Sequence, residues 1–120
     1  VTAHIYSADH QSDMNKKYVA AFEKANHFRP NFMSVGGYDG MALLYGALQK
    51  TGGKADGDSL IAAMKGMKWE SPRGPISIDP ETRDIIQNVY MRKVEKKNGQ
   101  LYNVEFETFK DVKDPAKIKK

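Results

Sequence analysis

The hydrophobic period changes from helical to alternating near residue 67, and this change limits the possible folds more than any other feature. From about residue 12 to residue 67 the apolar residues recur three and four positions apart, as on one face of a helix. Beyond that point they alternate with polar residues, as on a half-buried strand. Residues 1–6 also alternate, so the expected order is a strand, three helices and then strands. This order within 120 residues predicts a mixed α/β or α+β arrangement.

Capping residues mark the three expected helices. Ser12 followed by Asp13 is typical of an N-cap with an acidic first turn. Gly52 suits the left-handed conformation that commonly ends a helix. The expected bounds are residues 12–26, residues 34 or 37 to 51, and residues 57 to about 67.

The last part of the chain is expected to form strands and a hairpin. Turn-forming residues at 71–75 and 79–83 flank a short strand that contains Ile76 and Ile78. Asn98-Gly99 fits a type I′ turn, because both residues tolerate positive φ. The sequence therefore predicts a hairpin with strands over 85–94 and 101–109, followed by a frayed or linker-like segment from residue 114.

Composition excludes several functional classes. The chain has no cysteine, which excludes disulfides, thiolate nucleophiles and iron–sulfur clusters. Its three histidines accompany no nucleophile-elbow motif, so we expect no catalysis and no cofactor. No apolar run approaches the roughly 18 residues of a membrane span.

Three local patterns each allow a ligand site and a plain structural role. Asp9-His10 with His4 offers metal ligands, but a polar loop after a strand explains them without a metal. The glycines of residues 36–40 suit a phosphate at a helix N-terminus or a closely packed helix start. The basic pairs near Asn98-Gly99, with a pI near 9.2, suit nucleic acid or a solvated hairpin tip. The aromatic residues of the hairpin are then expected to be half-buried core rather than a stacking platform for bases.

Three segments together resemble one protein family. They are Asn-Lys-Lys-Tyr-Val-Ala-Ala-Phe-Glu-Lys at 15–24, Tyr-Asp-Gly-Met-Ala-Leu-Leu-Tyr-Gly-Ala-Leu at 38–48 with Thr-Gly-Gly at 51–53, and Ser-Pro-Arg-Gly-Pro-Ile-Ser-Ile-Asp at 71–79. Their order and spacing resemble the C-terminal third of type I periplasmic substrate-binding proteins. The nearest branch includes the Leu/Ile/Val-binding proteins of branched-chain amino-acid ABC transporters.

The resemblance implies a fragment of a larger two-lobe fold, each lobe being Rossmann-like. Residues 1–11 would be a strand and crossing from lobe 2, 12–79 part of lobe 1, and 80–84 a second crossing. Residues 85–112 would be a lobe 2 hairpin and 113–120 a tail. The unfinished apolar faces would be covered by the remainder of the same protein or by a swapped homodimer.

The resemblance also implies a function without chemistry. A small-molecule solute, an amino acid or a small aliphatic or aromatic carboxylate, would be captured between the lobes and delivered to the membrane permease of an ABC transporter. The location would be the periplasm, or the cell exterior with a membrane anchor in a bacterium lacking an outer membrane. Two alternatives stay open, which are the ligand-sensing domain of a receptor with this fold and a basic nucleic-acid-binding module.

Five residues are candidate ligand contacts by this resemblance. His4, Tyr6 and Ser7 follow the first strand, while Met33 and Tyr38 lie near the start of the second helix. A bulky side chain near Met33 would wall the pocket, and the tyrosines would stack on the solute or bind it through a hydroxyl. The structural alternative for each is packing at a hinge or at a helix end.

Overall fold

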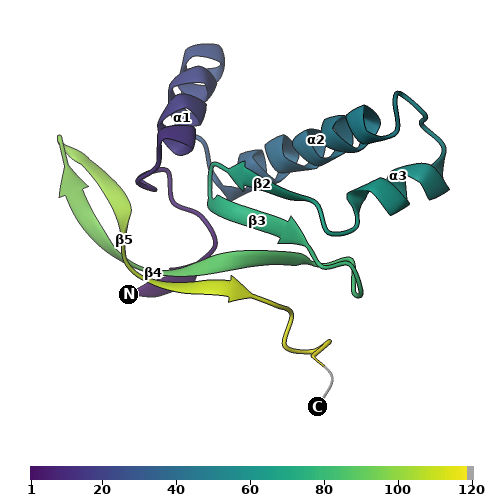
Figure 1. The fold of residues 1–120 in the computed structure, drawn as a ribbon. Helices are drawn as coiled ribbons and strands as arrows, with labels where there is room; N and C mark the ends of the chain where they lie inside the picture. The colour runs from purple at the N-terminus through teal and green to yellow at the C-terminus, as the bar shows by residue number, and fades with distance from the viewer. Residues whose placement is uncertain (119–120) are drawn as a thin grey trace.

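The structure, a computed structural model, describes residues 1–118 and confirms the mixed α/β class. Its elements are β1 (Thr2–His4), α1 (Asp13–Asn26), α2 (Phe32–Lys50), α3 (Gly57–Met64), β2 (Lys68–Ser71), β3 (Gly74–Ile78), β4 (Ile85–Lys97) and β5 (Gln100–Val112). The three helices lie on one side of the strands, and the β4–β5 hairpin extends past them toward α1 (Figure 1). Within the described residues, no helix combines the length and the apolar character that a membrane crossing requires.

Strand β4 lies at the centre of the sheet and pairs with β1, β3 and β5. The strand order is β1-β4-β3-β2, with β5 also paired to β4, and every pairing is antiparallel. Ile85 and Ile86 pair with β3, whereas Tyr90 to Arg92 pair with β1. The first residues of β4 therefore belong to the part of the sheet under α2, and the rest belongs to the hairpin.

An irregularity in the hairpin separates these two parts. The register between β4 and β5 shifts between Gln87 and Val89. Asp111 takes φ of 53° there, and its backbone N–H donates to the side-chain Oδ1 of Asn88 at 3.1 Å. Such a bulge bends the strand and increases its twist.

The expected helices form, with one change at a boundary. The Ser12 side chain accepts from Asn15 N, which confirms the predicted cap of α1. Helix α2 begins earlier than expected, because the Asn31 side chain accepts from the backbone N–H groups of Met33 and Ser34. The glycines at 36–40 thus lie inside α2, and the alternative of a phosphate site is wrong because they are not at a helix N-terminus. A closely packed helix start is wrong as well, because the space beside Gly36, Gly37 and Gly40 is open among the described residues.

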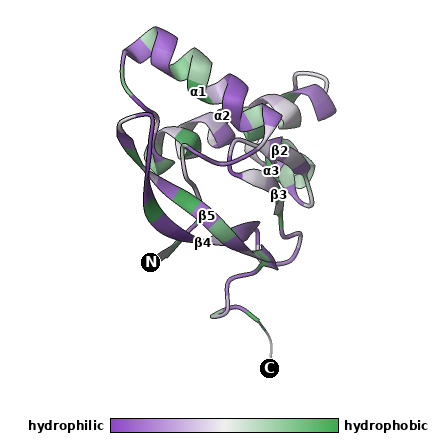
Figure 2. Cartoon of the chain, turned by 90° about the vertical axis from the view of Figure 1, so that its left-hand side faces the viewer, coloured by the Kyte–Doolittle hydropathy of each residue, from purple (hydrophilic) through white to green (hydrophobic). Residues whose placement is uncertain are grey.

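The hairpin at Asn98-Gly99 is confirmed, and a second hairpin was not expected. Asn98 has φ of 50° and Gly99 has φ of 81°, as a type I′ turn requires. Both strands are longer than predicted, and polar and apolar residues alternate along them (Figure 2). Strand β2 was missed because Trp69 is the one large apolar residue in it, so its alternation is weak.

The core lies between the N-terminal segment and the first two helices. Tyr6, Tyr18 and Val35 are buried together, with Val19 and Phe22 packed against them. The described hairpin residues contribute Tyr90, which is 2% exposed. Phe106 and Phe109 are 51% and 50% exposed, so these two hairpin aromatics are half-buried as expected but lie outside the core of the described residues.

The segment after β5 is tied to the β3–β4 loop rather than frayed. Lys113 Nζ lies 3.1 Å from Asp79 Oδ2, and Lys117 Nζ lies 2.8 Å from Asp84 Oδ2. Residues 119–120, the end of the expected tail, lie outside the described residues. Both lysines are exposed, so these pairs contribute little free energy but do orient the segment.

Candidate functional site

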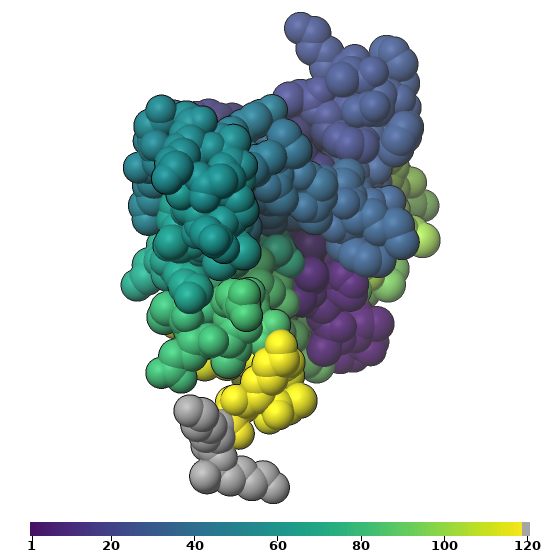
Figure 3. Space-filling view, turned by 90° about the vertical axis from the view of Figure 1, so that its right-hand side faces the viewer, coloured from purple at the N-terminus to yellow at the C-terminus, as the bar shows by residue number. Residues whose placement is uncertain are grey.

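A pocket of about 280 Å³ lies where the segment after β1 meets the α1–α2 loop and the hairpin. In the space-filling view the N-terminal segment lies directly below the blue surface of the helical region (Figure 3). Its lining includes the side chains of His4, Tyr6, Ser7, Arg29, Phe32, Arg92 and Tyr102. Three of the five candidate residues therefore line one pocket.

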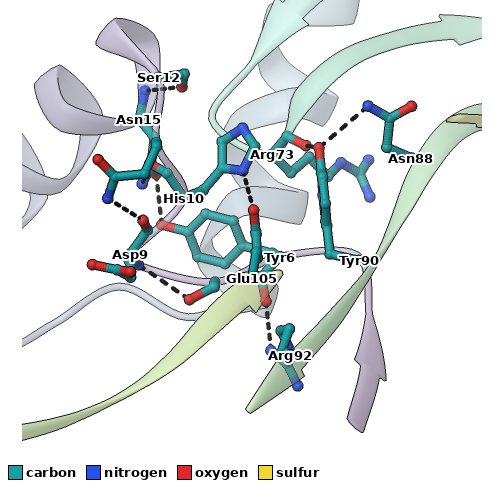
Figure 4. Close-up of polar contacts among 12 residues, drawn as sticks. Tyr6, Asp9, His10, Ser12, Asn15, Arg73, Asn88, Tyr90, Arg92 and Glu105 are labelled. Atoms are coloured by element: carbon teal, nitrogen blue, oxygen red, sulfur yellow. Dashed lines mark hydrogen bonds and ion pairs between the residues drawn. The ribbon is translucent and has the colours of Figure 1, made fainter. Parts of the chain in front are cut away.

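Tyr6 forms the floor of this pocket and is 3% exposed. Its hydroxyl donates to Asn15 Oδ1 at 2.9 Å. The Asn15 amide is itself fixed, because its Nδ2 donates to the carbonyl oxygens of Ala8 and His10 at 3.0 and 2.9 Å (Figure 4). Burial raises the pKa of the Tyr6 phenol well above its usual value, so it stays protonated. The hydroxyl proton is committed to the core, and only a small part of the Tyr6 surface reaches the pocket.

Ser7 joins the pocket to the hairpin. Its hydroxyl donates to the backbone oxygen of Asn103 at 2.5 Å and accepts from Asp9 N at 3.1 Å. The residue is 5% exposed. The Ser7 hydroxyl thus positions the hairpin beside the pocket.

His4 is held as a neutral ring at the pocket edge. Its Nδ1 accepts from Tyr6 N at 3.3 Å, and its ring meets Phe32 edge-on with centroids 5.0 Å apart. Burial, and next the charge of Arg92, lower the pKa of the imidazole. A neutral imidazole next to two apolar or aromatic rings suits the flat face of an aromatic solute.

Arg92 is a pocket residue that sequence reasoning missed. Its Nη1 donates to Tyr6 O at 2.7 Å, and its Nη2 donates to Thr2 Oγ1 at 3.1 Å. The sequence placed it in a solvated basic pair with Lys93. Strand parity was the available signal, because Arg92 lies two residues from buried Tyr90 and therefore faces the same side of β4.

Met33 and Tyr38 lie apart from this pocket. Met33 is 71% exposed on the first turn of α2. Tyr38 is 41% exposed, and its ring meets Tyr18 edge-on at 5.1 Å.

Asp9 and His10, which follow the candidate residues along the chain, both contact the hairpin. His10 Nδ1 lies 2.7 Å from Glu105 Oε2, and Lys97 Nζ donates to Asp9 Oδ2 at 2.6 Å (Figure 4 draws the former). Among residues 1–118 no three His, Asp or Glu side chains gather as metal ligands. Asp9 and His10 therefore hold the hairpin, and each side chain binds a different hairpin residue.

Asp39, Ser71 and Arg73 form a second buried polar group, beneath α2. Asp39 Oδ2 lies 3.0 Å from Arg73 Nε and accepts from the Ser71 hydroxyl at 2.8 Å. Burial raises the pKa of Asp39, and the hydrogen bond from Ser71 and the charge of Arg73 oppose that shift. This group fixes α2 on the β2–β3 turn and lies outside the pocket lining.

Comparisons with known proteins agree with this arrangement. A solute-binding protein of an ABC transporter from Rhodopseudomonas palustris BisB5, solved in complex with 3,4-dihydroxybenzoic acid, is 72% identical. It superposes with a TM-score of 0.96 over 98% of this chain and 32% of that one. A second, from R. palustris HaA2 in complex with p-hydroxybenzoic acid, is 47% identical with a TM-score of 0.89, over 97% of this chain and 32% of its own.

Curated relatives match over the same extent. The Leu/Ile/Val-binding protein homolog 6 of Brucella abortus (strain 2308) is 47% identical over 119 residues. The match covers 97% of this chain, which spans about 30% of the length of that relative. The family model described as periplasmic binding protein matches residues 1–100. With the whole of β1 to β4 inside that match, the chain belongs to the periplasmic binding protein family.

Proposed function

We propose that the full-length protein containing this chain captures a small aromatic carboxylate between two lobes and delivers it to the permease of an ABC transporter. The observation that carries the proposal is the 72% identical solute-binding protein whose structure holds 3,4-dihydroxybenzoic acid. Binding makes and breaks no covalent bond, so the protein is not an enzyme. Its place is the periplasm or the outer face of the cell.

The chemistry of the pocket supports an aromatic acid. The rings of His4 and Phe32 offer flat apolar surface above buried Tyr6, and Arg92 supplies positive potential. A volume of about 280 Å³ is near the lower end of the range of roughly 300–1,000 Å³ for small-molecule sites. In this proposal His4, Tyr6 and Ser7 belong to the solute site, and Met33 and Tyr38 wall it from α2 once the lobes are complete.

The lobe assignment follows the elements of the chain. Residues 12–79, with the three helices, belong to lobe 1, and residues 1–11 with the hairpin of 85–112 belong to lobe 2. Residues 80–84 make the crossing, and 113–120 form the tail. The antiparallel pairing of β1 with β4 supports the grouping of the N-terminal segment with the hairpin.

The exposed apolar residues of α2 are assigned to contact with the remainder of the full-length protein. Met33, Met41 and Tyr45 are 71%, 45% and 60% exposed. The relatives are about three times as long as the matched region, since it covers 30% of one of them. That length supplies enough chain to cover this face without a swapped homodimer.

Paired basic residues favour a solute over nucleic acid. Arg92 donates to Tyr6 O, and Lys97 and Lys93 contact Asp9 and Glu95 at 2.6 and 3.1 Å. Side chains used in this way offer few free charges to a phosphate backbone. We therefore propose no nucleic-acid partner.

A ligand panel tests the function on the full-length protein. Thermal unfolding and calorimetry would compare 4-hydroxybenzoate, 3,4-dihydroxybenzoate, benzoate, leucine and valine. A solute at 100 times its Kd stabilises by about 2.7 kcal/mol, so the aromatic acids should raise Tm and the amino acids should not. Stabilisation by leucine alone would contradict the ligand class, and stabilisation by none of them would contradict solute capture.

Two neighbouring substitutions localise the site. Arg92→Gln removes the guanidinium that lines the pocket, whereas Lys93→Gln removes the same charge from an exposed side chain that pairs with Glu95. We expect Arg92→Gln to weaken binding of the preferred acid about tenfold or more, in line with the loss of a charge-assisted contact of about 1.5–3 kcal/mol. Equal Kd values for the two variants would place the site elsewhere.

A further inference from the structure

Arg29 bridges the α1–α2 loop and the tip of the hairpin. Its Nη1 donates to Leu101 O at 2.8 Å, and its Nη2 donates to Gln100 Oε1 at 2.5 Å. Its guanidinium carbon lies 3.8 Å from the centroid of the Tyr102 ring. One side chain thus holds three consecutive residues of β5 that are more than 70 positions away in the sequence.

The bridge forms part of the lining of the candidate site. Arg29 and Tyr102 both line the pocket of about 280 Å³ that contains His4 and Tyr6. The same two residues also line a neighbouring hollow of about 330 Å³ against α1. Because each belongs to both linings, the stacked pair stands between the solute pocket and this more open hollow.

The hairpin also contacts the N-terminal segment. Ser7, Asp9 and His10 bind Asn103, Lys97 and Glu105, and they follow strand β1, which is paired with β4. This segment is itself held to α1, because Asn15 Nδ2 donates to the carbonyl oxygens of Ala8 and His10. The Arg29 contacts add a separate link from the hairpin tip to the loop that leads into α2, and this link breaks when the tip moves away from that loop.

We propose that Arg29 with Gln100, Leu101 and Tyr102 forms a latch that holds the hairpin tip over the solute pocket and sets the residence time of the solute. The inference rests on the proposed function and adds a positioning residue to it. The planar guanidinium is suited to this role, because it binds two acceptors and a ring face at once with little loss of side-chain freedom. A solute that favours the closed arrangement then dissociates only after the latch opens.

Binding kinetics test the latch on the full-length protein. Stopped-flow mixing with 4-hydroxybenzoate and 3,4-dihydroxybenzoate would compare the wild type with Arg29→Gln and Arg29→Lys. Lys24→Gln is the matched control, because it removes a positive charge from the exposed last turn of α1. We expect Arg29→Gln to raise koff about 10- to 100-fold with kon changed less than about threefold, since lost closing contacts act mainly on dissociation. Arg29→Lys should lie between, and the control should match the wild type.

A second readout separates the latch from the proposed function. Spin labels on cysteines introduced at Lys17 and Lys96 report the distance between α1 and the hairpin, and the 120 residues of this chain contribute no native cysteine. Arg29→Gln should broaden and lengthen this distance with or without solute. Unchanged koff with an unchanged distance overturns the latch. If the wild type binds neither acid, the proposed function fails, and the distance alone decides the latch, with an unchanged distribution overturning it.

Discussion

The carboxylate of Asp39 on α2 lies 3.0 Å from the Nε of Arg73 in the β2–β3 turn, and the two side chains are 5% and 10% exposed. Gln87 on β4 accepts from Arg73 Nη1 at 2.7 Å, so the same guanidinium links the β2–β3 turn to both α2 and β4. A buried charged pair contributes little net stability, because desolvation offsets much of its attraction. Its main effect is on geometry. It fixes which face of α2 lies on the strands.

Removing one partner of this pair should lower the free energy of unfolding more than removing both. Arg73→Met leaves the Asp39 carboxylate buried without its cation, and we expect the free energy of unfolding to fall by about 3–5 kcal/mol. Adding Asp39→Leu should recover part of the loss, as measured by urea denaturation of the full-length protein. A double variant less stable than Arg73→Met would contradict this account.

Removing the Tyr6 hydroxyl should destabilise the fold. Tyr6→Phe leaves the buried Oδ1 of Asn15 without the donor described above, at a cost of about 1–3 kcal/mol. Tyr45→Phe is the matched control, because Tyr45 is 60% exposed, and it should stay within about 0.5 kcal/mol of the wild type. The comparison is made by thermal unfolding, and equal Tm values for the two variants would show that the hydrogen bond is not important.

Protonation of His4 should weaken the solute-free protein. Burial lowers the pKa of His4 in the folded state, so the unfolded state binds the proton more readily. The stability contributed by the neutral ring is therefore present above the ordinary pKa near 6.5 and is lost as pH falls through the lower folded value. His4→Gln should flatten the dependence of unfolding free energy on pH between about 7 and 5. NMR titration of the His4 ring gives the direct measurement, and a midpoint above 6.5 would reverse the sign.

The open face of α2 should be sensitive to added bulk in the full-length protein. Replacing glycine in an exposed helix normally stabilises by about 0.5–1 kcal/mol, and the space beside Gly40 is open within the described chain. If the remainder of the protein covers this face, Gly40→Leu should instead cost about 1–3 kcal/mol by overpacking. A more stable Gly40→Leu variant would argue that the face is uncovered.

Local signals made part of this fold predictable. Ser12 and the Asn98-Gly99 turn act through neighbouring backbone groups, so α1 and the hairpin follow from a few residues. Helix α2 begins before its glycines because Asn31, which follows Pro30, caps it. Strand β2 depends on pairing with β3, which its own alternation does not reveal.

The candidate site was harder to predict than the fold. The segment of His4, Tyr6 and Ser7 was identified through a family resemblance, and the structure places it along one pocket. Arg29 and Arg92 come from a loop and a strand that are distant in sequence, and a single chain gives no sign that they meet. The exposure of Phe106 likewise depends on which elements pack against the hairpin, and the local alternation of residues does not reveal this.

The bulge at Asn88 and Asp111 gives the hairpin the geometry of a lever. About ten residues separate Asn88 from the tip at Asn98, which at roughly 3.3 Å per residue is an arm of about 33 Å. A rotation of only about 10° at the bulge would sweep the tip through about 6 Å, farther than any hydrogen bond can stretch. Small changes of twist near the base of β4 are therefore amplified into an all-or-none gain or loss of contact at the far end.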